Sequence, residues 1–561
     1  MDEVGGETRS AVRRCSADRP PSIGIAFLSG NDVSSRKTFC YAAAMRNNIG
    51  LLLAKRASLS PMMDGLVEVE RERRFTFAGV NARCNRTANA LRALGIGPGD
   101  RVALLLMNGV EFTASFFAIA KIGAVVVPLN WRLVADELAF ILGDSGAVVL
   151  IYDEEFRDLV TDLHTRGSAA TAVRHWIEVT PSGVPASFAL AYDAVQAEAS
   201  DVEPPVGASD DDDAYIMYTS GTTGLPKGVV HTHDSVLWAC FTIALTADTR
   251  YRDRYAIVLP LFHVGALTPL IGNVQRGMTS ILMRAFDPVR LYETIAEERV
   301  SVLLAVPAML NFMLQVPDLG KYDCSSLRWI MSGAAPVPVT LIEAYAKRGI
   351  EVHQVYGLTE SCGPACLISP EDAIAKAGST GKPFFHTDVR IVDDAGNECP
   401  PGTPGEVLVR GKHVMKGYWK RPEATAETLR DGWLHTGDVA TIDAEGFVFI
   451  NDRKKDMIIS GGENIYPAEI ENVILSHPKV REVAVIGHPS AKWGESPLAV
   501  VVKGDPSLTE SEVVAWSRGK LAGYKRPRAV RFVDEIPRNP AGKILKRDLR
   551  KPYWEGRSSN V

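Results

Sequence analysis

Short apolar segments alternate with helical ones from about residue 50 onward, and this alternation constrains the fold more than any other feature of the chain. Residues 80–94 have the composition of a helix, which glycines and a proline terminate, and residues 112–122 form a second helical segment. Apolar runs at 101–107 and 124–128 flank the second helix. Further apolar runs recur at 147–152, 256–260, 302–306 and 328–331. Because parallel strands are joined by helices and buried on both faces, the pattern predicts an α/β fold with a mostly parallel sheet.

The two ends of the chain differ from this pattern. Residues 1–44 are rich in Ser, Arg, Gly and Asp without a sustained period, which predicts a disordered N-terminal extension. A start codon misassigned upstream of Met45 is an alternative. After about residue 385, short strands and turns dominate up to the charged run 452–455, and a compact α/β unit follows. Strands are expected at 388–392, 405–409 and 446–450, followed by helix 467–476, strands 480–486 and 497–503, helix 508–521 and strand 528–534. We therefore predict three parts, at residues 1–44, 45–452 and 453–561.

Charge and cysteine usage argue against several classes of protein. The formal net charge is −5, without the basic excess of a nucleic-acid surface. The 8 cysteines form no CxxC pair and the histidines do not cluster at metal-ligand spacing, so free thiols in a reducing cytoplasm are expected. The uncharged stretch 255–275 contains prolines and glycines, which favours a buried strand, loop and helix over a membrane span.

The strongest functional motif is Tyr218-Thr-Ser-Gly-Thr-Thr-Gly-Leu-Pro-Lys-Gly-Val229, called the signature loop below. Its glycines allow backbone N–H groups to approach an anion, and its hydroxyls and Lys227 add donors and charge. A Walker A loop is excluded, because Gly228 follows Lys227 where that motif has Ser or Thr. The segment therefore predicts a phosphate-binding loop that follows a strand.

The signature loop resembles that of the adenylate-forming (AMP-binding) superfamily, which includes acyl-CoA synthetases, firefly-type luciferases and adenylation domains of nonribosomal peptide synthetases. Further motifs match in the same order, so the resemblance covers residues 46–550. It implies a large domain of parallel-sheet α/β subdomains with a small β-barrel-like subdomain. A small, mobile C-terminal α/β domain is implied after a hinge near 453–455.

The resemblance also assigns the second nucleotide motif, Val355-Tyr-Gly-Leu-Thr-Glu360. A carboxylate beside a triphosphate can hold Mg²⁺, and Glu360 takes that role by resemblance. Thr359 is implied to bond the α-phosphate, and Tyr356 to stack on adenine. The other residues implied to bind nucleotide are Thr219, Ser220, Gly221, Thr222, Thr223 and Gly224 of the signature loop, Gly333 and Ala334 of the Ser332-Gly-Ala-Ala-Pro336 turn, Gly357, and Asp438 with Arg453 at the ribose.

Motifs in the C-terminal part resemble those that change the site between two half-reactions. Lys455 matches the hinge position. Gly461 and Gly462 match a loop that lets the pantetheine arm of CoA pass close to the backbone. Lys543 matches a mobile catalytic lysine, whose ammonium can meet both the carboxylate and the α-phosphate.

His263 has two open interpretations. It matches a family position at the edge of the acyl pocket, and it is equally well explained as a core histidine with satisfied hydrogen bonds. The preceding Phe262 offers no carboxylate for an amino-acid substrate, which favours an acid without an α-amino group.

Together the motifs imply an acyl-CoA synthetase that uses ATP, Mg²⁺ and coenzyme A. The overall pattern is most similar to bacterial fatty-acyl-CoA ligases, which favours a medium- or long-chain fatty acid over an aryl or sterol-side-chain acid. Alternatives are an acyl-AMP ligase that loads a carrier protein, a luciferase-like oxygenase, and a non-catalytic nucleotide- or acyl-binding protein. The expected location is cytoplasmic, with peripheral membrane contact for a lipid substrate and a homodimer as open alternatives.

Overall fold

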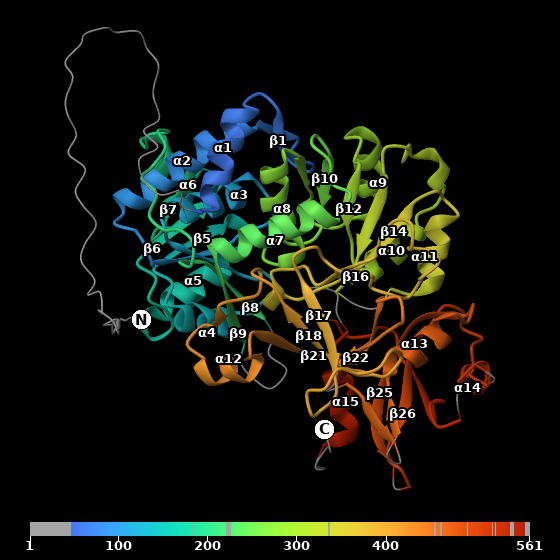
Figure 1. Ribbon diagram of the computed structural model, residues 1–561. Helices are drawn as coiled ribbons and strands as arrows, with labels where there is room; N and C mark the ends of the chain where they lie inside the picture. The colour runs from blue at the N-terminus through green and yellow to red at the C-terminus, as the bar shows by residue number, and fades with distance from the viewer. Residues whose placement is uncertain are drawn as a thin grey trace, which may run out of the picture. The chain divides into compact units, whose positions relative to one another are not determined.

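The computed structural model describes residues 47–555 except 182, 220–225, 335–336, 454–455, 461–462, 491, 519, 522 and 539–543. The predicted N-terminal extension, residues 1–44, lies outside the described residues. Helices and strands alternate along most of the described chain (Figure 1). This alternation confirms the α/β class predicted from the sequence.

Two large sheets carry most of the strands. Within the described residues, one sheet has nine strands and the other has eight. In spatial order, the nine strands are β16 (Lys382–Pro383), β15 (Cys366–Leu367), β14 (Glu351–Tyr356), β13 (Trp329–Ser332), β12 (Val302–Leu304), β10 (Arg254–Ile257), β11 (Thr279–Leu282), β1 (Asp64–Glu68) and β2 (Arg73–Thr76). The eight are β19 (Gly417–Tyr418), β9 (Lys227–Thr232), β8 (Asp213–Thr219), β4 (Val125–Pro128), β3 (Arg101–Leu105), β5 (Val149–Asp153), β6 (His175–Val179) and β7 (Leu190–Ala191). The central pairs of both sheets are parallel, as predicted.

Helices fill the connections between these strands. They are α1 (Gly50–Leu59), α2 (Phe77–Ala93), α3 (Val110–Lys121), α4 (Ala135–Ser145), α5 (Arg157–Thr165), α6 (Tyr192–Ala197), α7 (His233–Thr246), α8 (Val264–Arg276), α9 (Pro288–Glu297), α10 (Pro307–Leu314) and α11 (Val339–Ala346). The uncharged stretch 255–275 forms β10, a loop and α8, which confirms its interpretation as a buried path. No helix in the described part of the chain has the length and apolar character needed to cross a bilayer.

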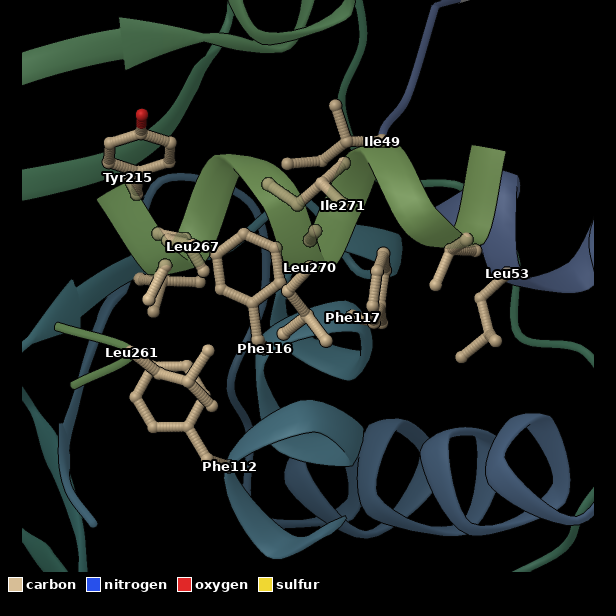
Figure 2. Close-up of a cluster of buried hydrophobic side chains, with 14 of the residues drawn as sticks. Ile49, Leu53, Phe112, Phe116, Phe117, Tyr215, Leu261, Leu267, Leu270 and Ile271 are labelled. Atoms are coloured by element: carbon tan, nitrogen blue, oxygen red, sulfur yellow. The ribbon is translucent and has the colours of Figure 1, made fainter. Parts of the chain in front are cut away.

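The largest hydrophobic core contains side chains from both sheets and from the helices between them. Every residue of α3 is buried. Its two charged residues are ion-paired: Glu111 with arginines and Lys121 with Glu203. Figure 2 shows Phe116 and Phe117 of α3 pointing toward Leu267 and Leu270 of α8. These contacts hold the helices that follow β3 and β10, so the carboxyl ends of strands from both sheets are fixed by one core.

The predicted β-rich region forms a third, antiparallel sheet. Its strands are β17 (Asp388–Val392), β18 (Gly405–Arg410), β21 (Trp433–Ile442), β20 (Leu429–Arg430) and, paired with β21, β22 (Val448–Arg453). Helix α12 (Pro422–Thr428) precedes β20. This region matches the small β subdomain that the resemblance implies.

The C-terminal residues form a fourth, mixed sheet with its own core. Its elements are β23 (Ile458–Ser460), β24 (Glu463–Ile465), α13 (Pro467–Leu475), β25 (Val480–Ser490), β26 (Gly494–Lys503), α14 (Glu510–Trp516), β27 (Ala529–Phe532) and α15 (Lys546–Trp554). The predicted order of these elements is confirmed, but helix 508–521 is shorter than predicted. The strand predicted at 446–450 is shifted toward the C-terminus: β22 runs from Val448 to Arg453, because antiparallel pairing with β21 extends that far. The domain boundary near 452 stays a prediction.

Candidate active site

The signature loop connects two antiparallel strands. Thr219 ends β8 and Lys227 begins β9, and the two residues are paired across the hairpin. The hydroxyl of Thr219 donates to the carbonyl of Lys227 at 3.5 Å. The structure therefore places the two ends of the loop side by side, as a phosphate-binding turn requires. Ser220, Gly221, Thr222, Thr223 and Gly224 lie outside the described residues.

The second nucleotide motif forms a tight turn after β14. Tyr356 ends the strand, and Thr359, Glu360 and Ser361 form a short 3₁₀ turn, called the Glu360 turn below. Gly357 is required there, because a Cβ atom at this position would lie 1.4 Å from the carbonyl oxygen of Gly363. The glycine thus lets the chain fold back on itself, and the turn presents the half-buried Glu360 beyond the strand end.

Two buried histidines hold the main chain of the Glu360 turn. His231 Nε2 lies 2.7 Å from the carbonyl oxygen of Thr359, and His413 Nδ1 lies 2.8 Å from that of Ser361. A carbonyl only accepts hydrogen bonds, so each of these nitrogens is the protonated one. Burial lowers the pKa of both histidines to about 4, which keeps the imidazoles neutral near pH 7. A third bond, from the backbone N–H of Met415 to the carbonyl of Glu360, is 2.8 Å long.

The side chain of Glu360 is also held. The hydroxyl of Tyr418 donates to Glu360 Oε1 at 2.9 Å. The ammonium of Lys227 lies 5.0 Å from the centroid of the Tyr418 ring, within the range of a cation–π contact. Tyr418 therefore contacts both residues to which the resemblance assigns the triphosphate and its metal ion.

The predicted ribose residues come together around Tyr356. The Tyr356 hydroxyl donates to Asp438 Oδ2 at 2.7 Å, and both side chains are buried. Asp438 of β21 is paired with Arg453 of β22 in the antiparallel register. The structure thus places the residue predicted to stack on adenine beside the residue predicted to bind ribose.

The turn after β13 lies against β14. A Cβ atom at Gly333 would meet the carbonyl oxygen of Val355 at 2.3 Å, and Ala334 has a positive φ of 66°. A non-glycine residue in the left-handed region is uncommon and is retained where the surrounding structure requires it. The hydroxyl of Ser332, the last residue of β13 and the first of the motif, is buried without a hydrogen-bond partner among the described residues. The arrangement brings Gly333 next to Val355, the first residue of the second nucleotide motif.

His263 begins α8 as its N-cap residue. Its Nε2 is buried and has no hydrogen-bond partner in the described part of the chain. This finding weakens the interpretation as a satisfied core histidine, because buried polar atoms are normally paired. Burial, and then the charge of Arg132, lower the pKa of His263 to about 4, so the ring is neutral near pH 7. A neutral imidazole nitrogen without a partner can bond a ligand.

The described residues fit a magnesium ion that is coordinated partly by the protein and partly by the phosphates of a substrate. They contain no group of three or more His, Cys, Asp or Glu side chains that could hold a metal by themselves. Mg²⁺ commonly binds through one or two carboxylates together with phosphate oxygens and water. Glu360 follows β14 and is the carboxylate that the second nucleotide motif assigns to the ion. Its oxygens are the hard donors that Mg²⁺ prefers.

The C-terminal predictions are described only in part. Lys455, Gly461, Gly462 and Lys543 lie outside the described residues, and the side chain of Arg453 does too. Three residues after Lys543, the ammonium of Lys546, whose side chain is 13% exposed, pairs with Glu471 at 2.9 Å and Asp452 at 3.5 Å. Asp452 also accepts a hydrogen bond from the backbone N–H of Ala468, in the first turn of α13.

Sequence reasoning missed Tyr418, His231 and His413. His231 lies in β9, only four residues after Lys227. This closeness in sequence to the signature loop could have marked it as a candidate site residue. Tyr418 lies 58 residues from Glu360, and His413 lies 52 residues from Ser361. No local pattern connects residues at such separations. Tyr418 comes to the Glu360 turn through the pairing of β19 with β9, and His413 lies in the segment just before β19.

Comparison with known proteins agrees with this geometry. A family model described as AMP-binding enzyme matches residues 54–419, and one described as AMP-binding enzyme C-terminal domain matches residues 469–543. Long-chain-fatty-acid–CoA ligase FadD13 of Mycobacterium tuberculosis is 48% identical over 506 residues, which cover 90% of this chain and 98% of the relative. Feruloyl-CoA synthase of an Amycolatopsis species is 42% identical over 515 residues, covering 91% and 100%.

A solved structure extends the comparison to a nucleotide complex. O-succinylbenzoate coenzyme A synthetase (MenE) of Bacillus subtilis, in complex with ATP and magnesium ion, has a TM-score of 0.78 and 35% identity, covering 90% of this chain and 99% of that one. The first family model covers Lys227, Glu360 and Tyr418, and the second covers β25, β26, α14 and β27 of the C-terminal part. The chain therefore belongs to the AMP-binding enzyme family and is an AMP-forming acid–thiol ligase of that family.

Proposed function

We propose that the protein activates a medium- or long-chain fatty acid with Mg·ATP and transfers the acyl group to coenzyme A. The observation that supports it most is that the predicted nucleotide residues are connected, although they come from β9, the Glu360 turn and β21. Tyr418 links Lys227 to Glu360, and Tyr356, four residues before Glu360, bonds Asp438. This set offers a cation for phosphate, a carboxylate for a metal and a carboxylate for ribose hydroxyls.

In the first half-reaction the carboxylate of the acid attacks the α-phosphorus of ATP. A bond forms between the carboxylate oxygen and phosphorus, the bond to the β-phosphate oxygen breaks, and pyrophosphate leaves with its electron pair. Lys227 and Thr359 bind phosphate oxygens, and Asp438 accepts from the ribose. Lys543 aligns the carboxylate with the α-phosphate. Bound at Glu360, Mg²⁺ supplies charge neutralisation for the triphosphate.

In the second half-reaction the thiolate of coenzyme A attacks the carbonyl carbon of the acyl-AMP. The thiol proton has passed to the solvent when the thiolate forms. A C–S bond then forms, the bond between the acyl carbon and the phosphate oxygen breaks, and AMP leaves with that electron pair. The C-terminal domain pivots at Lys455, which withdraws Lys543 and brings Gly461 and Gly462 to the pantetheine arm. Because acyl-AMP is itself the activated species, no covalent enzyme intermediate is needed. The protein contributes mainly positioning and electrostatic stabilisation.

Two classes of carboxylic acid compete as the substrate, a fatty acid and an aryl acid. Similarity to the long-chain-fatty-acid ligase of M. tuberculosis supports a fatty acid. An aryl acid is the alternative, since feruloyl-CoA synthase is also a relative and His263 Nε2 lacks a partner in the described residues. A hydroxyl group on an aromatic acid would satisfy that nitrogen, whereas an alkyl chain would leave it unpaired.

The proposal is tested by measuring AMP and pyrophosphate release from Mg·ATP over a panel of fatty and hydroxyaryl acids, with and without coenzyme A. Turnover with a fatty acid that requires coenzyme A is the expected result. Acyl-AMP formation without stimulation by coenzyme A would point to a carrier protein as acceptor. Activity with aryl acids alone would overturn the fatty-acid part. Failure of every acid in the panel would place the substrate outside both classes and would overturn the proposed substrate.

The proposed setting is the cytoplasm, with peripheral contact to a membrane that supplies the lipid substrate. The support is the proposed fatty acid itself, which partitions into bilayers. A homodimer belongs to the same proposal, and sedimentation of the full chain with and without lipid vesicles tests both points.

A further inference from the structure

We propose that Tyr418 is a positioning residue that fixes the metal-binding carboxylate of Glu360 and keeps it apart from Lys227. This inference rests on the proposed function, because it takes Glu360 as the magnesium ligand and Lys227 as a phosphate ligand. It concerns a residue that none of the motifs assigned a role.

The place of Tyr418 in the sheet is determined by strand pairing. β19 pairs antiparallel with β9, and Tyr418 lies opposite Val229, two residues beyond Lys227. Two backbone bonds enclose this pair: Lys416 N–H to the carbonyl of Val230 at 2.9 Å, and Trp419 N–H to that of Gly228 at 2.7 Å. The tyrosine therefore lies on a strand joined directly to the end of the signature loop.

The Glu360 turn is anchored to the same short segment at two points. Met415 N–H bonds the main-chain carbonyl of Glu360, and the Tyr418 hydroxyl bonds Oε1 of its side chain. With its backbone and one carboxylate oxygen both held, Glu360 loses most of its rotamer freedom before any ligand arrives. The carboxylate is thereby pre-organised, with Oε2 not engaged by Tyr418. Hydrogen bonds to a ligating carboxylate commonly tune metal affinity in this way.

The contact of Tyr418 with Lys227 has a separate consequence. A lysine and a glutamate at one site tend to pair, and such a pair would compete with both phosphate and metal ion. Among the described ion pairs none joins Lys227 to Glu360, and the Lys227 ammonium instead contacts the Tyr418 ring at 5.0 Å. Tyr418 thus offers one group to each charge, the hydroxyl to the anion and the ring to the cation. Both charges then stay available to Mg·ATP.

The test is Mn²⁺ binding to the full-length protein in the presence of α,β-methylene-ATP, followed by electron paramagnetic resonance. Tyr418→Phe keeps the ring beside Lys227 and removes only the hydroxyl. The expected result is Mn²⁺ affinity weakened by roughly 10-fold. Binding of the nucleotide analogue in excess chelator should stay unchanged, because the hydroxyl acts on the metal ligand.

Tyr152→Phe is the matched control. The Tyr152 hydroxyl also donates to a glutamate, Glu178, at 2.9 Å, and it lies in the same sheet, at the pairing of β5 with β6. This variant loses an equivalent bond away from the Glu360 turn and should keep wild-type Mn²⁺ affinity. Equal weakening in both variants would indicate a general loss of sheet stability and would overturn the proposal, as would wild-type affinity in Tyr418→Phe.

A double-mutant cycle separates positioning from folding. In a Glu360→Gln background, Tyr418→Phe should weaken Mn²⁺ binding no further, because the carboxylate through which it acts is gone. Additive losses would contradict the proposal. The measurement uses no acid substrate, so the proposed fatty acid can fail while Tyr418 still affects Mn²⁺ affinity. Conversely, a working ligase with an unaltered Tyr418→Phe variant would overturn only this inference.

Discussion

Lys543 is the residue on which the proposed adenylation depends most. Its ammonium is expected to neutralise charge that develops between the carboxylate and the α-phosphate. Lys543→Ala should lower acid-dependent ATP–pyrophosphate exchange by roughly 10²–10³-fold, the usual effect of removing one such donor. Thioester formation from supplied acyl-AMP should change much less. Lys551→Ala, at an exposed lysine of α15, is the control. Unchanged exchange in Lys543→Ala would show that the assigned mechanism is wrong.

Gly357 gives a second prediction at the residue scale, based on its contact with Gly363. The added Cβ of Gly357→Ala would meet a carbonyl oxygen at 1.4 Å, so the chain would have to move. We expect a loss of about 1–3 kcal/mol or more in unfolding free energy, together with reduced Mg·ATP binding because the Glu360 turn shifts. Gly97→Ala, whose added Cβ atom would have no neighbour within 4 Å among the described residues, should leave urea unfolding nearly unchanged. Similar unfolding of the two variants would contradict the crowding seen at Gly357.

Among the elements, the Glu360 turn is held by neutral histidines, and this gives it a pH dependence. The pKa of His231 and of His413 falls from 6.5 to about 4 on folding. The unfolded chain therefore binds protons that the folded chain excludes, so each histidine costs stability as the pH falls from 6.5 toward 4. The full loss is on the order of 3 kcal/mol per histidine.

Replacing one histidine with a residue that cannot titrate tests this sign. Urea unfolding of His413→Gln should lose less stability between pH 6.5 and 4 than the wild type does, because one proton-linked group is gone. Glutamine retains an amide donor, which can still reach a carbonyl such as that of Ser361. A variant whose stability falls as steeply as the wild type's would show that His413 does not titrate as inferred.

The elements also show what a sequence can predict. Runs such as 101–107 and 124–128 form β3 and β4 because a continuous apolar segment has few other ways to be buried. The ends of elements are predicted less accurately, as at helix 508–521, because pairing and packing decide where an element stops. The motifs identify Glu360 and Asp438, whereas Tyr418 and His413 escape them because their partners are brought to them only by sheet pairing.

At the scale of the whole molecule, one core supports both large sheets. Phe117 of α3 packs in the core that also contains Leu270 of α8, and both are fully buried. Phe117→Ala should lower unfolding free energy by about 3–5 kcal/mol, through lost burial and the cavity that remains. Leu245→Ala, at an exposed position of α7, is the control and should have little effect on urea unfolding. A small effect at Phe117 would mean that the core collapses around the gap.

Asp452 links the end of β22, which also carries the predicted ribose residue Arg453, to the first turn of α13 and to Lys546. A protein engineer who exchanged C-terminal modules between relatives by joining them after residue 452 would separate this carboxylate from its evolved partners. In the transplanted module, the backbone N–H of Ala468 would depend on an acceptor supplied by the other protein. The ammonium of Lys546 would likewise face whatever residue that protein has at position 452. Grafts that carry β22 with the module keep these contacts. They also exchange Arg453 and its strand, so the predicted ribose residue and the module are inherited together.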